Sequence, residues 1–122
     1  MLKASNVDAE LDLDTLPLLE GAEQTVRAGI LSSLQTQNVR SRWAIANSPE
    51  TFGVPRFALL FDPQTSGGLL AGVSATEAES CVRDLHAMGY GASAIIGTVL
   101  SRSDRPEMVT LRTVSASLQG ET

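Results

Sequence analysis

The chain has 122 residues, of which 43% are hydrophobic and 19% charged, and it carries a formal net charge of −5. This composition fits one soluble globular domain with a real core, and the negative charge argues against nucleic-acid binding, which relies on Lys and Arg. One cysteine excludes an intrachain disulfide framework, and no apolar run approaches the roughly 20 residues of a membrane span. We expect a cytoplasmic protein without nucleic-acid or membrane partners.

Residues 6–13 alternate between apolar and polar side chains, which predicts a half-buried strand. The polar side carries Asn6, Asp8, Glu10 and Asp12. Three carboxylates in a row allow a metal site, but a solvated sheet face explains the same pattern and is favoured. No metal-binding residue is therefore assigned.

The spacing of Ala22, Val26 and Ile30 predicts an amphipathic helix from Gly21 to about Ile30. Residues 31–48 predict a short second helix within an irregular connection. Trp43 is expected to be partly buried against the sheet or at a domain junction, because its large apolar area is rarely left exposed to water without a reason.

Two strands are predicted at Arg56–Phe61 and Leu69–Val73, with a polar loop between them. The candidate binding residues of this loop are Asp62, Gln64, Thr65, Ser66, Gly67 and Gly68. The paired glycines permit positive φ and a nest of backbone N–H groups that holds a phosphate. A purely structural tight loop is the alternative, and composition alone favours it.

Ser74 and Glu77 form a capping-box pattern before a predicted helix that ends at Gly89. Cys81 lies on the apolar face of this helix, so we expect an inert thiol. His86 is the only histidine and has no histidine or cysteine close enough in sequence to form a metal pair, so we expect a surface or boundary residue. We assign no catalytic residue.

Further strands are predicted at Ser93–Leu100 and Met108–Val114, followed by a flexible tail at 115–122. The predicted fold is α+β, a mixed or antiparallel sheet with helices packed on it. Its core order is the ferredoxin-like β-α-β-β-α-β with one extra strand, in a single domain spanning residues 1–114.

The run from Leu60 to Leu70, LFDPQTSGGLL, resembles the signature of the C-terminal half of selenophosphate synthetase (selenide, water dikinase). The segments 16–22, 28–34 and 94–99, together with Asn38, are also similar to that family. The resemblance covers about Met1 to Leu111.

This resemblance implies a member of the aminoimidazole ribonucleotide synthetase superfamily, with the fold of its C-terminal domain. The family converts selenide, ATP and water to selenophosphate, AMP and phosphate with magnesium, and the full enzyme is expected to be a homodimer. The family's catalytic Cys or selenocysteine, its lysine and its metal-binding aspartates belong to an N-terminal domain that is absent here, and Cys81 does not replace them.

We therefore expect a C-terminal domain that is inactive alone, binds no cofactor by itself, and covers or completes the ATP and phosphate cleft when its N-terminal partner domain is present. The opening Met1-Leu2-Lys3 looks like the interior of a helix, which suits such a piece. The alternative is a stand-alone module that binds a small anion or regulates another protein. An exposed apolar patch would favour the first hypothesis.

Overall fold

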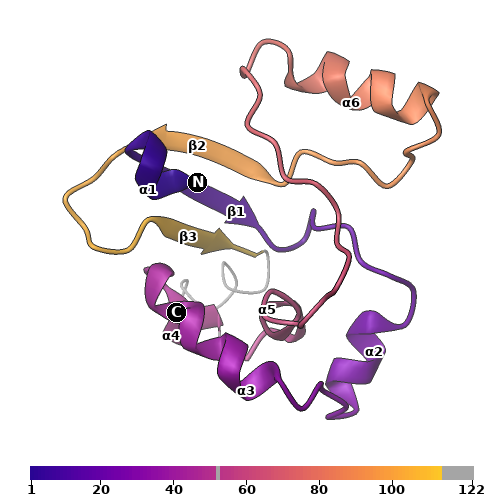
Figure 1. The fold of residues 1–122 in the computed structure, drawn as a ribbon, viewed down its shortest axis with the longest axis vertical. Helices are drawn as coiled ribbons and strands as arrows, with labels where there is room; N and C mark the ends of the chain where they lie inside the picture. Colours follow the sequence, from indigo (N-terminus) through magenta and orange to yellow (C-terminus); the bar gives the residue numbers. More distant parts are fainter. Residues whose placement is uncertain (52, 114–122) are drawn as a thin grey trace, which may run out of the picture.

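A computed structural model describes residues 1–51 and 53–113, which form a three-stranded mixed sheet with helices beside it (Figure 1). The elements in chain order are α1 Leu2–Ser5, β1 Val7–Asp12, α2 Ala22–Arg27, α3 Gln35–Asn38, the 3₁₀ helix η1 Val39–Ala44, α4 Ser48–Thr51, α5 Pro55–Leu59, α6 Ala78–Ala87, β2 Gly97–Ser101 and β3 Val109–Arg112. The predicted α+β class is confirmed.

The central strand of the sheet is β1, and the strand order is β2-β1-β3. β1 runs antiparallel to β2, with Val7 opposite Ser101, and parallel to β3, with Ala9 opposite Val109. The strands predicted at both ends of the chain are therefore confirmed. Val114 and the predicted tail 115–122 lie outside the described residues.

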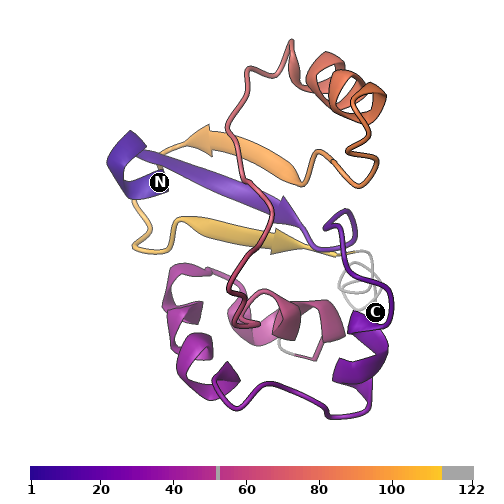
Figure 2. The same ribbon diagram turned by 45° about the vertical axis from the view of Figure 1, so that its right-hand side comes forward.

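The buried core lies where helices pack against the β3 side of the sheet, as Figures 1 and 2 show. Leu13, Phe57, Phe61 and Leu111 form its centre. The rings of Phe57 and Phe61 meet edge to face, with centroids 5.2 Å apart. Burying each such side chain is worth about 1.5–3 kcal/mol, so this cluster fixes α5 against the sheet.

The prediction of a strand at Arg56–Phe61 is wrong, because α5 forms there. Pro55 occupies the first turn of the helix, where its missing N–H costs nothing. Phe57 and Phe61 lie four residues apart, so one helix face delivers both rings to the core. A short apolar run fits either period, and here tertiary packing selects the helix.

The outer edge of β3 is covered by the segment that follows η1. The side-chain amide of Asn47 donates to the carbonyl oxygen of Leu111 at 2.7 Å and accepts from the Leu111 N–H at 2.9 Å. The N–H of Ala46 donates to the carbonyl of Val109 at 2.8 Å. Asn47 therefore pairs with β3 much as a neighbouring strand would.

The strand predicted at Leu69–Val73 is also absent, because this stretch belongs to a long connection without helix or strand between α5 and α6. Both predicted central strands are thus missing, and the ferredoxin-like order is not confirmed. In both ribbon views α5 lies on the β3 side of the sheet and α6 on the β2 side (Figures 1 and 2).

The helix predicted after Ser74 forms, although it begins only at Ala78. Ser74 donates to the Glu77 carboxylate at 2.7 Å, so it contacts a side chain before the helix and caps no helix N–H. The predicted end at Gly89 is confirmed. Its φ of 98° lets the N–H groups of Gly89 and Tyr90 reach the carbonyls of His86 and Leu85, a Schellman motif.

Within residues 1–51 and 53–113, no helix has both the length and the apolar character needed to cross a lipid bilayer.

Candidate functional site

The loop that carries the predicted binding residues begins where α5 ends, and α3 holds that end in place. The Gln35 amide donates to the carbonyl of Ala58 at 2.6 Å, and the Asn38 amide donates to the carbonyl of Phe61 at 3.0 Å. The Ala58 carbonyl also accepts the N–H of Phe61 at 3.2 Å, and Phe61 lies beyond the last residue of α5, so the two amides anchor the end of this helix and the turn after it. Asp62 follows directly and is half-buried.

A cleft of about 600 Å³ lies between this loop and α3. Its lining residues are Ser32, Leu34, Asn38, Asp62, Pro63, Gln64 and Thr65. The structure therefore brings Asp62, Gln64 and Thr65 together, with the Gln64 amide 3.4 Å from the Asp62 carboxylate. Ser66, Gly67 and Gly68 are exposed and do not line the cleft.

The two glycines of the loop do not adopt the conformation that the nest hypothesis needs. Among the described glycines, positive φ occurs at Gly21, Gly29 and Gly89. A nest of N–H groups requires a residue in the left-handed region, so Gly67 and Gly68 do not form one here.

The chemistry of this cleft is that of hydrogen bonding rather than charge neutralisation. It presents one carboxylate, the amides of Gln64 and Asn38, and the hydroxyls of Ser32 and Thr65, and neither Lys nor Arg lines it. A phosphate group placed here would meet hydrogen-bond donors but no cation, and it would lie near the Asp62 carboxylate. The cleft therefore offers hydrogen bonds to a ligand but no positive charge to neutralise an anion.

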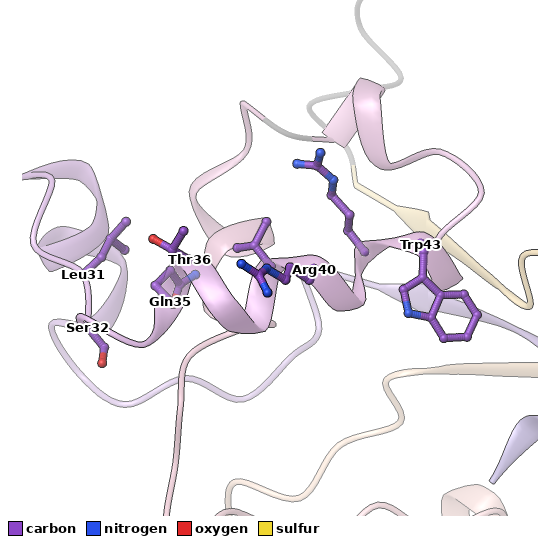
Figure 3. Close-up of a pocket in the computed structure, with 8 residues that line it drawn as sticks. Leu31, Ser32, Gln35, Thr36, Arg40 and Trp43 are labelled. Carbon is purple, nitrogen blue, oxygen red and sulfur yellow. The ribbon is translucent and has the colours of Figure 1, made fainter.

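A second hollow of about 650 Å³ lies on the other side of α3, along η1 (Figure 3). Its lining residues are Leu31, Ser32, Gln35, Thr36, Val39, Arg40, Arg42 and Trp43. Trp43 is 68% exposed, so the prediction of burial against the sheet is wrong, and a domain junction stays a prediction. Arg40 and Arg42 form no ion pair with any described residue.

Gln35 lines this second hollow, and only one half of its amide is hydrogen-bonded. Its nitrogen bonds to Ala58, whereas its buried Oε1 has no hydrogen-bond partner among the described residues. Sequence reasoning did not predict this second hollow. The signal available was an isolated tryptophan beside two arginines in an irregular stretch of an acidic chain.

The acid row of β1 is occupied by partners from the chain's C-terminal part. Asp8, only 3% exposed, accepts hydrogen bonds from Arg102 at 2.6 Å and from the N–H and hydroxyl of Ser103 at 3.0 and 2.6 Å. Glu10 pairs with Arg112 at 2.9 Å. Carboxylates of this row therefore form ion pairs, and the prediction of a solvated sheet face is wrong at Asp8.

The remaining side chains that were considered for metal binding or nucleophilic chemistry are the acidic groups, His86 and Cys81. In the part of the chain that the structure describes, no group of three or more His, Cys, Asp or Glu side chains has the arrangement to hold a metal ion. His86 is exposed on α6 and its Nε2 lies 2.8 Å from the carbonyl oxygen of Ser93, which confirms the surface assignment. Cys81 is half-buried on the same helix.

Comparison with curated proteins identifies what this chain is similar to. A selenide, water dikinase of Clostridioides difficile is 33% identical over 108 residues, which is 86% of this chain and 30% of that protein. One from Rhizobium meliloti is 32% identical over 98 residues, 80% of this chain and 28% of that protein. The chain is selenophosphate synthetase-like. A third selenide, water dikinase, from Pelobacter propionicus, is 55% identical over 42 residues, 34% of this chain and 12% of that protein.

The selenophosphate synthetase-like chain spans about 30% of the length of the curated relatives it matches. No protein-family model matches it. The similarity predicted from the LFDPQTSGGLL run is thus confirmed at the level of the family name.

Proposed function

We propose that the chain acts as the C-terminal domain of a selenophosphate synthetase, which makes selenophosphate, AMP and phosphate from selenide, ATP and water with magnesium. The similarity to selenide, water dikinases over 80–89% of this chain carries the proposal. Those relatives are nearly three times as long, so the catalytic Cys or selenocysteine, the lysine and the metal ligands come from their remaining part. The isolated chain is inactive in this scheme.

An exposed apolar surface beside the cleft supports docking of that remaining part. We call it the helical face, made of Ile30 (65% exposed), Leu31 (50%), Leu34 (50%) and Trp43 (68%). Tryptophan and arginine are enriched at protein interfaces, and Arg40 and Arg42 flank this face without ion-pair partners among the described residues. A stand-alone module would be expected to keep such a surface charged.

The position of the helical face explains how the loop contributes. Leu34 belongs to both the helical face and the cleft that Asp62, Gln64 and Thr65 line. We infer that a domain docked at Leu34 reaches the cleft and supplies the cations that the lining of the cleft lacks. We propose that residues 62–68 complete the ATP and phosphate cleft in this way.

A chimeric enzyme tests the proposal. The segment of the Clostridioides difficile selenide, water dikinase that matches this chain is replaced by the chain, and selenophosphate and AMP formation are measured. We expect activity from the chimera and none from the isolated chain. Substitution D62N should lower kcat/KM at least tenfold, whereas D104N, on an exposed aspartate outside the cleft, should not.

An inactive but folded chimera would contradict the assignment to this enzyme. The anion-binding alternative is then tested by titrating the isolated chain with ATP, with and without magnesium, and following the amide signals of residues 62–68. Saturable shifts in the isolated chain would favour the stand-alone module.

A further inference from the structure

Among residues 1–51 and 53–113, the sheet has one open edge, on β2. The N–H of Asp12 donates to the carbonyl of Ile96 at 2.9 Å, and hydrogen-bonded pairs alternate along an antiparallel ladder. Thr98 and Leu100 therefore direct their backbone groups to β1, whereas Val99 directs its N–H and C=O outward. In the described part of the chain β2 pairs with β1 alone, while Asn47 covers the opposite edge of the sheet.

The same chain contains an unpaired segment that matches this edge. Residues 63–73 make no backbone–backbone hydrogen bond with any described residue. Leu69 is 103% exposed, Leu70 61% and Val73 46%. Unpaired backbone beside exposed large apolar side chains is the form in which a strand is added to a free sheet edge.

The apolar side chains of the two elements also correspond. Consecutive residues of a strand point to opposite faces, so Val99 and Leu100, 57% and 44% exposed, place one apolar side chain on each face of β2. Leu69 and Leu70 would do the same in an added strand. The six residues from Gly68 to Val73 are long enough to cover the five residues of β2.

The route of the chain disfavours pairing between this segment and the β2 edge of the same copy. The connection starts at α5 on the β3 side and ends at α6 on the β2 side. It runs past the ends of β1 and β3 in Figure 1 and across the strands in Figure 2, so it does not follow β2 in either view. The segment of a second copy does not have this constraint, because its ends are attached to α5 and α6 of its own copy and not to those of the copy that carries the edge.

We propose that two copies of the chain exchange residues 68–73, each segment adding a strand to the open edge of β2 in the other copy. When each copy receives the segment of the other, the two contacts are equivalent and are related by a two-fold axis, so the reciprocal exchange closes as a dimer. This contact uses a surface different from the helical face and is independent of selenophosphate chemistry.

Light scattering on size-exclusion fractions tests the exchange. The chain should elute with twice its monomer mass of 12.9 kDa, in a proportion that rises with concentration. The double variant L69P/L70P should be monomeric, because consecutive N–H groups point in opposite directions and one of the two must face the edge. The variant V99P should also be monomeric, since its N–H faces outward and β1 pairing is kept.

Mixing the two variants gives the sharpest test. Each dimer contains two exchanges, and a heterodimer of L69P/L70P with V99P keeps one of them intact, so the mixture should recover part of the dimer. The control L19P, at a leucine 82% exposed in another connection, should remain dimeric. Far-ultraviolet circular dichroism checks that each variant is folded. A monomeric parent chain, open-ended aggregates, or dimers in every variant would overturn the proposal.

Discussion

The hydroxyl of Ser103 donates a 2.6 Å hydrogen bond to the carboxylate of Asp8, and so joins the first strand to the loop that follows the second. The Ser103 N–H and Arg102 complete the set of donors. The Ser103 hydroxyl bond is the main cause that lowers the pKa of Asp8, against burial, which raises it. Asp8 is thus a buried carboxylate that stabilises the fold while it is ionised.

Acid should weaken the fold through Asp8. Because the folded-state pKa is below the unfolded value, the contribution of Asp8 is complete above the ordinary carboxyl pKa of about 3.9 and is lost as the pH falls through the lower folded value. Urea unfolding at a series of acidic pH values should show a smaller decline in D8N than in the parent chain. The variant D104N, at an exposed aspartate, should decline like the parent, and an unchanged slope in D8N would contradict this role.

Replacing Asn47 by alanine should destabilise the chain by about 2 kcal/mol. The substitution leaves the N–H and C=O of the buried Leu111 without partners, and each unsatisfied buried group costs about 1–3 kcal/mol. Chemical unfolding gives the free energy. N47D should rescue little, since a carboxylate accepts from the Leu111 N–H but donates nothing to its carbonyl.

Substitution G97A should destabilise the sheet. A methyl group at Gly97 would collide with the backbone carbonyl of Glu10 on the neighbouring strand, so β2 or β1 must shift. A loss of about 1–3 kcal/mol is expected from such overpacking, measured by thermal unfolding. G68A is the matched control, because nothing lies near a Cβ at that glycine, and it should change stability little.

Arg56 should be hard to replace. Its guanidinium donates to the carbonyls of Leu13, Asp14 and Leu16 at 2.9, 3.2 and 3.1 Å, which ties α5 to the turn after β1. Hydrogen bonds to charged groups contribute about 1.5–3 kcal/mol each, so R56A should lower the free energy of unfolding by at least about 1.5 kcal/mol. R56K should recover only part, since lysine lacks the fixed fork of donors. Equal stability of R56K and the parent would show that charge alone matters.

Local patterns predicted some elements well and misassigned others. Alternation predicts β1, and glycine chemistry at Gly89 predicts where α6 ends, because both signals are local. The run 56–61 has no decisive period, and its assignment depends on Phe57 and Phe61 meeting core residues that lie far away in the chain. The burial of Asp8 depends on Ser103, which no local pattern connects to it.

For the candidate site too, sequence patterns predicted some residues and missed others. Asp62, Gln64 and Thr65 stand in one conspicuous run and do line a cleft. The amides of Gln35 and Asn38 that shape this cleft act across more than twenty residues of sequence, so pattern reading did not predict their roles. The size of Trp43 predicts burial against the sheet or at a domain junction, and the structure leaves the side chain exposed at a hollow instead of packing it on the sheet.

The strand order has a consequence for how the chain is made. β1 is the first strand, yet its partners are the last two, with Val7 opposite Ser101 and Asp12 opposite Arg112. During synthesis β1 stays unpaired until residues 97–112 have left the ribosome. Such long-range pairing slows folding, because a long loop must close before the strands can form their contacts. The sheet should therefore form in one late step, and β1 should need protection until its partners are available.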